Sequence, residues 1–262
     1  MKKFLAMVLT GIMVLSCAVG LSACKGMDES TYEMYVKAYE ALNSVDSVIL
    51  KGGAEVSGVY GEETMSMVMD FTAEEIIKSA TDIDMRMVMS IEATEETGMP
   101  EEMVMFYTGG NYYTEIMGQK IKIVMPVEDM VAQANMAAIE FPETAIKSES
   151  AKDVSGGKEL SFTINGNEIK DVLSKSVSGM GDASTAEILL GMDIENVTIK
   201  TVIDKKGNFK TLELNFSTDI VQNEESISMS FLMTMEIVQI GGVTIDFPAD
   251  LEDYMDISGF EL

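Results

Sequence analysis

Few side chains in this sequence have the chemistry of a catalyst. The chain has no histidine, which removes the commonest general base and most nucleophilic triads. Ser155 and Lys158 match the S-x-x-K spacing, but that motif works at the start of a helix, where both side chains share one face. Here Gly156-Gly157 predicts a hairpin turn between the two residues. The sequence therefore predicts a protein that is not an enzyme.

Adjacent glutamates are the remaining candidates for acid–base or Ca²⁺ chemistry. They occur as Glu62-Glu63, Glu74-Glu75, Glu95-Glu96, Glu101-Glu102 and Glu224-Glu225. We expect them at loops and strand ends, where solvated charge discourages pairing between sheet edges. No calcium-loop spacing and no Gly-rich phosphate loop is present. We predict neither a metal site nor a cofactor.

The N-terminal segment has a recognisable chemical role. Residues 1–23 have a basic start, a long apolar run and small residues before Cys24, which is the build of a secretory signal. The end of this segment, Leu21-Ser22-Ala23-Cys24, resembles a bacterial lipobox. The resemblance implies that Cys24 carries a diacylglyceryl group as the mature N-terminus, and two acyl chains anchor a protein stably. The alternative is an uncleaved transmembrane helix of about 20 residues.

The charge of the chain limits its partners. Removing residues 1–23 takes Lys2 and Lys3 from 18 basic side chains and none from 44 acidic ones, so the net charge changes from −26 to about −28. Such a surface repels nucleic acid and anionic head groups, and we predict no nucleic-acid partner. Because Cys17 lies in the removed segment, the mature body has no disulfide and no Cys/His zinc site.

Alternating methionines are the second feature of the sequence. From Ile83 to Ile91 every odd position is apolar, and three of these positions are methionine. Alternate side chains of a strand share one face, so we expect Asp84, Arg86 and Ser90 to face outward. The same pattern recurs in three other segments. The predicted lining of this face comprises Met65, Met67, Met69, Met85, Met87, Met89, Met103, Met105, Met229, Phe231, Met233 and Met235.

The elements that would carry this face follow from periodicity and turn residues. Helices are predicted at 31–45, 127–141, 167–177 and 186–190, and the segment 72–80 fits either a strand or a helical turn. Strands are predicted at 47–57, 62–71, 82–93, 101–108, 111–116, 120–125, 144–154, 158–164, 194–203, 209–217 and 226–240, with a short edge strand at 243–248. We divide the chain into a signal peptide (1–23), a lipidated tether (24–30) and a single domain (31–262).

This layout, with the lipobox and the closing Ile245-Asp246-Phe247-Pro248, resembles the LolA-like superfamily of lipoproteins. The closer likeness is to LppX/LprG-type lipoproteins and related Gram-positive lipoproteins of unknown function. The resemblance implies a mainly β fold with helices (α+β): a strongly bent antiparallel sheet, or half-open barrel, of about 11 strands with helices on its concave face. In characterised members an apolar cavity between the sheet and the helices holds acyl chains.

Two functions remain open at this stage. Methionine is flexible and polarizable, so the predicted face suits an adaptable pocket for a lipid or other apolar ligand, but it equally suits a solid core. The first hypothesis is an extracytoplasmic lipoprotein, anchored to the cell membrane at a Gram-positive surface, that binds or carries such a ligand. The second is a non-enzymatic envelope lipoprotein that acts through protein contacts, with a partner that the sequence does not name.

Overall fold

The computed structural model shows a mainly β chain with few helices. It describes residues 29–60, 63–79, 81–93, 102–116, 118–127, 141–168, 194–222 and 225–257. The predicted signal peptide with Cys24, most of the helix at 127–141 and nearly all of the helices at 167–177 and 186–190 lie outside these residues. The mainly β prediction is confirmed, whereas the placement of helices on a concave face stays a prediction.

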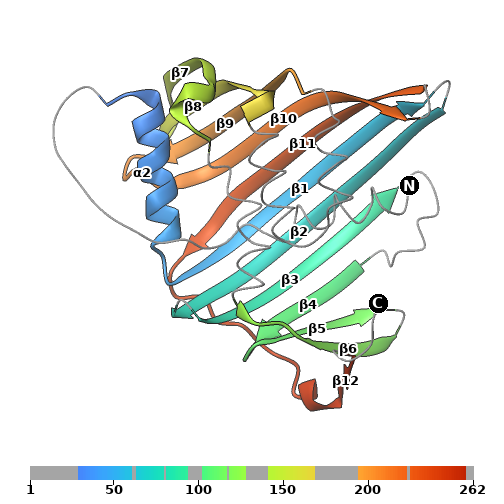
Figure 1. The fold of residues 1–262 in the computed structure, drawn as a ribbon. Coiled ribbons are helices and arrows are strands. Elements are labelled where there is room, and N and C mark those ends of the chain that lie inside the picture. The colour runs from blue at the N-terminus through green and yellow to red at the C-terminus, as the bar shows by residue number, and fades with distance from the viewer. Residues whose placement is uncertain are drawn as a thin grey trace. The chain divides into compact units, whose positions relative to one another are not determined.

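Twelve strands form one open sheet (Figure 1), in the order β12-β6-β5-β4-β3-β2-β1-β11-β10-β9-β8-β7. The strands are β1 (Ser47–Tyr60), β2 (Glu63–Ser79), β3 (Asp82–Ala93), β4 (Glu102–Thr108), β5 (Asn111–Ile116), β6 (Gln119–Val124), β7 (Ile146–Val154), β8 (Gly157–Asn165), β9 (Asn196–Asp204), β10 (Phe209–Gln222), β11 (Glu225–Ile240) and β12 (Met255–Asp256). Consecutive strands from β2 to β6 and from β7 to β10 pair antiparallel, whereas β12 runs parallel to β6.

The structure corrects two predictions about strands. The ambiguous segment 72–80 continues β2 to Ser79, so the helical turn is wrong. The edge strand at 243–248 is also wrong, since this segment is not in a strand and the twelfth strand is Met255–Asp256. Gly241 and Gly242 both have positive φ, a conformation that takes the chain out of β11. The alternating apolar residues at 243–248 reflect side-chain packing. Val243 is buried there, although its segment does not pair with another strand.

The described chain forms two compact units, which share three long strands. Unit 1 contains the helix α2 (Thr31–Asn43), strands β7 to β10 and the parts of β1, β2 and β11 at 54–60, 63–66 and 225–234. Unit 2 contains the rest of those strands, together with β3 to β6 and β12. The prediction of a single domain over 31–262 stays a prediction.

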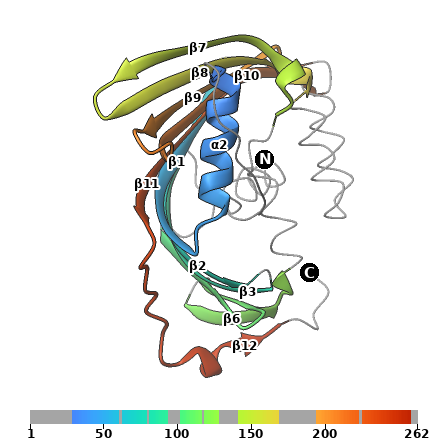
Figure 2. The same cartoon turned by 90° about the vertical axis from the view of Figure 1, so that its left-hand side faces the viewer.

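In unit 1, α2 begins at a capping box and packs through aromatic rings. The Ser30 hydroxyl accepts from Glu33 N at 3.1 Å, and Ser30 N donates to the Glu33 carboxylate at 2.9 Å, which satisfies two free donors of the first turn. Tyr35 is buried, with its ring 5.4 Å from that of Phe162 on β8 and 5.4 Å from that of Phe209 on β10. The helix lies beside the strands β8 to β10 of the same unit (Figure 2). The predicted N-terminal helix is confirmed, two residues shorter than expected.

Strands β8 to β10 of unit 1 alternate between buried and exposed residues. Cα register pairs Leu160 with Thr201 and Phe162 with Ile199, so their buried side chains lie on one face. Gly157 begins β8 where a Cβ atom would lie 1.8 Å from the carbonyl oxygen of Ile203. Only glycine allows that approach between the two backbones.

In unit 2, the C-terminal segment packs on one face of β4 to β6. Phe106, Tyr113 and Tyr254 form a buried cluster, and Phe247 and Leu251 pack against it. The 3-10 turn η2 (Leu251–Asp253) precedes β12 in this segment, whereas η1 (Glu143–Ala145) precedes β7 in unit 1. Ion pairs Lys120–Asp250 and Lys122–Asp256 fasten the segment to β6. The opposite face of β4 is therefore the one that carries Met103 and Met105.

Candidate functional site

The methionine face of unit 2, defined as Met67, Met69, Met85, Met87, Met89, Met103 and Met105, is built by strand register. Met87 of β3 pairs with Ala73 of β2 and with Met105 of β4. One step along β3, Met89 pairs with Phe71 and Met103. Directly paired residues of antiparallel strands project to the same side, so thioethers from three strands lie in adjacent rows.

Most of this face is buried. Met67, Met69, Met85, Met87, Met89 and Met105 are 0–8% exposed, and Met103 is half-buried. Each thioether side chain has three rotatable bonds and can adopt many shapes. The side chain of Met65, which was predicted for the same lining, is outside the described residues.

The predicted lining residues of β11 divide between the two units. Met235 belongs to unit 2 and is buried; Met233 belongs to unit 1 and is buried as well. Met229 and Phe231 are half-buried in unit 1, where the Phe231 ring lies 5.1 Å from that of Phe216 on β10. Their assignment to a ligand cavity stays a prediction.

Glu75 is a buried carboxylate on the methionine face that sequence analysis missed. We expected Glu74-Glu75 at a loop or strand end, and this is wrong because both residues lie within β2. Glu75 is 2% exposed and pairs with Met85, whereas Glu74 lies on the other face and pairs with Arg86 at 3.4 Å. The odd position of Glu75 in the strand could have predicted this burial, because Met69 and Phe71 at the preceding odd positions belong to the same buried face.

Two tyrosines extend the same row of the sheet. Met85 pairs with Tyr107 of β4, and Tyr107 pairs with Tyr112 of β5. The Tyr107 hydroxyl donates to the carbonyl of Met125 at 2.9 Å. Burial raises the pKa of Tyr112 well above its usual value, against the opposing effect of a hydrogen bond with Thr114. The Tyr112 phenol is therefore neutral at physiological pH.

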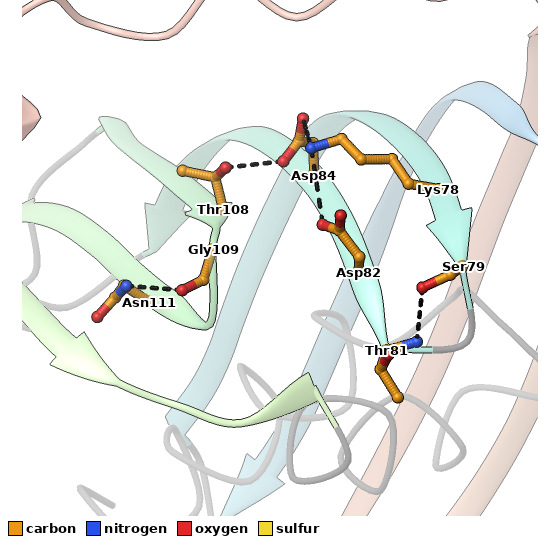
Figure 3. Close-up of polar contacts among 8 residues, drawn as sticks. All are labelled: Lys78, Ser79, Thr81, Asp82, Asp84, Thr108, Gly109 and Asn111. Carbon is orange, nitrogen blue, oxygen red and sulfur yellow. Dashed lines mark hydrogen bonds and ion pairs between the residues drawn. The ribbon is translucent and has the colours of Figure 1, made fainter.

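A polar cluster joins the hairpin ends of unit 2 on the opposite face (Figure 3). Lys78 Nζ lies 2.8 Å from Asp84 and 3.6 Å from Asp82, and the Thr108 hydroxyl donates to Asp84 at 2.7 Å. The hydrogen bond to Asp84 raises the pKa of Lys78. Even positions of β3 were expected to be solvent-facing, but Asp84 is only 8% exposed because these partners cover it. The cluster links β2, β3 and β4.

Unit 1 contains a buried threonine hydroxyl that, unlike the polar groups of the cluster in unit 2, has no partner among the described residues. Thr218 of β10 is buried, and its hydroxyl has no hydrogen-bond partner within the described structure. The neighbouring hydroxyls of Ser217 and Ser230 lie 3.2 Å apart, which places Thr218 opposite Met229 of β11. An unpaired buried hydroxyl costs about 1–3 kcal/mol.

The remaining sequence candidates have structural roles. Ser155 lies in the turn between β7 and β8, and Lys158 forms an ion pair with Asp153 at 3.0 Å, so the S-x-x-K match does not start a helix. Among the described residues, no group of three or more His, Cys, Asp or Glu side chains could hold a metal ion. No helix in the described part of the chain has the length and hydropathy to cross a membrane.

Two solved structures of lipoproteins are similar to this chain. LprF from Mycobacterium bovis is 13% identical, with 84% of this chain and 97% of LprF covered and a TM-score of 0.42. The lipoprotein LppX from Mycobacterium tuberculosis is 8% identical, with 84% of this chain and 100% of LppX covered and a TM-score of 0.38. LppX, which represents the type of lipoprotein that the sequence resembles, is thus among the solved structures to which this chain is similar.

The chain itself belongs to the family of unknown function DUF6612, which matches residues 30–254. This range includes α2, eleven of the strands and the whole methionine face of unit 2. No curated protein matches the chain. The family assignment therefore names no activity.

Proposed function

We propose that this protein is an extracytoplasmic lipoprotein, anchored to the cell membrane through Cys24, that binds or carries a lipid or other apolar ligand. The proposed binding surface is the methionine face of unit 2, within a bent half-barrel whose helices cover the concave side. The observation that carries the proposal is the set of buried methionines in register on β2, β3 and β4.

Methionine suits this role for a physical reason. An unbranched side chain with three rotatable bonds can repack around acyl chains of different length and shape. Each methylene that leaves water contributes about 0.8 kcal/mol, so an acyl chain can bind by burial alone. We do not propose a hydrolase activity. The chain has no histidine, and the catalytic motif considered in the sequence, Ser155 with Lys158, supplies no activated nucleophile.

Lipid extraction tests the binding proposal. The protein would be expressed with its own N-terminal segment, purified from bacterial membranes and analysed by lipid mass spectrometry after removal of free lipid. We expect a lipid at close to one molecule per protein, besides the covalent anchor. Met87→Phe should reduce the bound lipid severalfold by filling the face. Val88→Phe, which adds a ring at the next residue on the opposite face, should not.

The anchor needs its own test. Cys24→Ala should leave the protein as a precursor and abolish metabolic labelling with a radioactive fatty acid. Processing of this variant at the normal rate would contradict the lipobox assignment, and it would leave the binding proposal standing.

The second candidate is an envelope lipoprotein that acts through protein contacts. The observation that favours it is the burial of six methionines to 8% exposure or less, as in a filled core. It predicts no co-purifying lipid and one stoichiometric protein after crosslinking on intact cells. Bound lipid at equal stoichiometry would exclude the filled core.

A further inference from the structure

One row of side chains on the methionine face differs in chemistry from its neighbours. Register places Glu75, Met85, Tyr107 and Tyr112 side by side on four consecutive strands. Because paired residues project to the same face, one carboxylate and two phenol rings lie in this row. The adjacent row consists of Ala73, Met87, Met105 and Thr114, and it contains no charged or phenolic side chain.

The polar groups lie toward one end of the face. Along β2 the odd positions run from Met67 through Phe71 to Glu75, and along β4 they run from Met103 to Tyr107. Both strands run the same way, since each is antiparallel to β3. The polar row therefore lies toward the turn between β2 and β3, with one apolar pair, Ile77 and Ile83, between the row and the turn. An apolar surface with a polar row near one end matches an amphiphile.

The polar row is buried rather than solvated. Glu75 is 2% exposed and Tyr107 is fully buried, although glutamate is almost never buried without a partner. Glu75 does have an interaction within the chain. A carboxylate has about four acceptor positions, so it can bind a ligand donor as well. The hydrogen bond from Tyr107 to the carbonyl of Met125 holds that ring in place.

We propose that this row binds the head group of an amphiphilic ligand and that the head group is an ammonium. The inference rests on the proposed function and names its ligand class. Hydrogen bonds between an ammonium and a carboxylate are charge-assisted and strong, and the faces of tyrosine rings attract cations. An acidic head group would be repelled by Glu75 and by a chain of net charge −26.

Four probes with the same dodecyl chain test the head group: dodecylamine, dodecyltrimethylammonium, dodecanol and dodecanoate. Each is titrated below its micelle concentration or, for dodecanol, below its solubility limit. Neutral pH and physiological salt are used, so that the acidic surface is screened. We expect dodecylamine to bind the wild type about tenfold or more tightly than dodecanol, as one charge-assisted bond predicts. Dodecanoate should bind most weakly.

Two neighbouring variants separate the row from the general acidity of the protein. Glu75→Gln keeps the shape of the side chain and should abolish the preference for dodecylamine over dodecanol. Glu74→Gln removes the same charge one residue away, on the opposite face, and should retain the preference. Thermal unfolding without ligand shows whether each variant is folded. If Glu75→Gln does not fold, Tyr112→Leu should reduce dodecyltrimethylammonium binding severalfold relative to dodecanol binding.

The outcomes distinguish this inference from the proposed function. Dodecanol bound with no preference for the ammonium probes would overturn the head-group assignment and leave apolar ligand binding intact. A preference that survives Glu75→Gln and disappears in Glu74→Gln would also overturn it. If none of the four probes binds the wild type, the proposed function itself fails.

Discussion

The two units bury strand faces of different chemistry. In unit 1 the buried positions of β8 and β9 are Leu160, Phe162, Ile164, Val197, Ile199, Thr201 and Ile203. In unit 2 half of the described buried odd positions of β2 to β4 are methionine. Branched and ring side chains have few rotamers and specify one packing, whereas methionine fills irregular space and specifies packing poorly. The difference indicates that unit 1 is built for rigidity and that unit 2 has a face able to repack.

Truncation of one large side chain in each unit gives the largest expected effect. Phe162→Ala removes a ring that contacts Tyr35 and Phe141 and should lower the free energy of unfolding by about 3–5 kcal/mol. Met89→Ala should cost about 2–3 kcal/mol, the low end for methionine, because neighbouring methionines can move into the space. Urea unfolding measures both values. A larger loss of unfolding free energy for Met89→Ala than for Phe162→Ala would contradict the proposed difference between the two units.

The units also differ in which contacts stabilise their turns, and substitutions at these turns should give the second-largest loss of stability. Asp84→Ala removes the partner that joins Lys78 and Thr108 from two other strands, so it should cost about 1–3 kcal/mol. Asp204→Ala in unit 1 removes an oxygen that accepts from Lys206 N and Asn208 N within one turn. This local change should cost about 0.5–1.5 kcal/mol. Equal losses in urea unfolding would remove the distinction.

Swaps between methionine and branched residues sharpen the comparison further. Met87→Leu keeps volume and should cost well under about 1 kcal/mol, while Ile199→Met in unit 1 should approach about 1.5 kcal/mol. The reason is that a repackable face absorbs a change of shape. Differential scanning calorimetry of the two variants checks the order, and the reverse order would count against a repackable unit 2.

A pH titration gives the smallest effect. The hydrogen bond with Lys120 lowers the pKa of Asp250 and raises that of Lys120. The depressed carboxyl contributes stability that is lost as pH falls through its folded pKa, and the raised lysine contributes stability that is lost as pH rises through its folded pKa. Asp250→Asn should therefore lower the Tm slightly at neutral pH and not at strongly acidic pH. A Tm difference that grows in acid would contradict this sign.

The sequence predicted which face of a strand is buried better than it predicted which strands are adjacent in the sheet. Alternation placed Met85, Met87 and Met89 on one buried face because strand geometry fixes the parity of side chains. It could not show that β1 lies between β2 and β11, since pairing over long sequence separations leaves no local signal. Periodicity alone also assigned a strand to 243–248, where alternate side chains pack without a ladder.

Residue type was the second source of error. Glu75 was assigned to solvent because it is charged, although its parity matched the buried positions of β2. Asp84 was assigned to solvent by parity, although Lys78 and Thr108 cover it. Burial of a charged side chain depends on partners from other strands, and these become visible only once the register is known.

Methyl NMR tests the central claim most directly. The protein is labelled with ¹³C at the methionine methyls and, in a second sample, at the leucine methyls. Single Met→Leu and Leu→Met variants assign the signals, and dodecanol is then titrated in. We predict that the signals of Met85, Met87, Met89 and Met105 shift with saturation, whereas those of Leu160, Leu212 and Leu214 in unit 1 stay in place. Methionine signals that do not move at saturating dodecanol would contradict the claim that this face binds an apolar ligand.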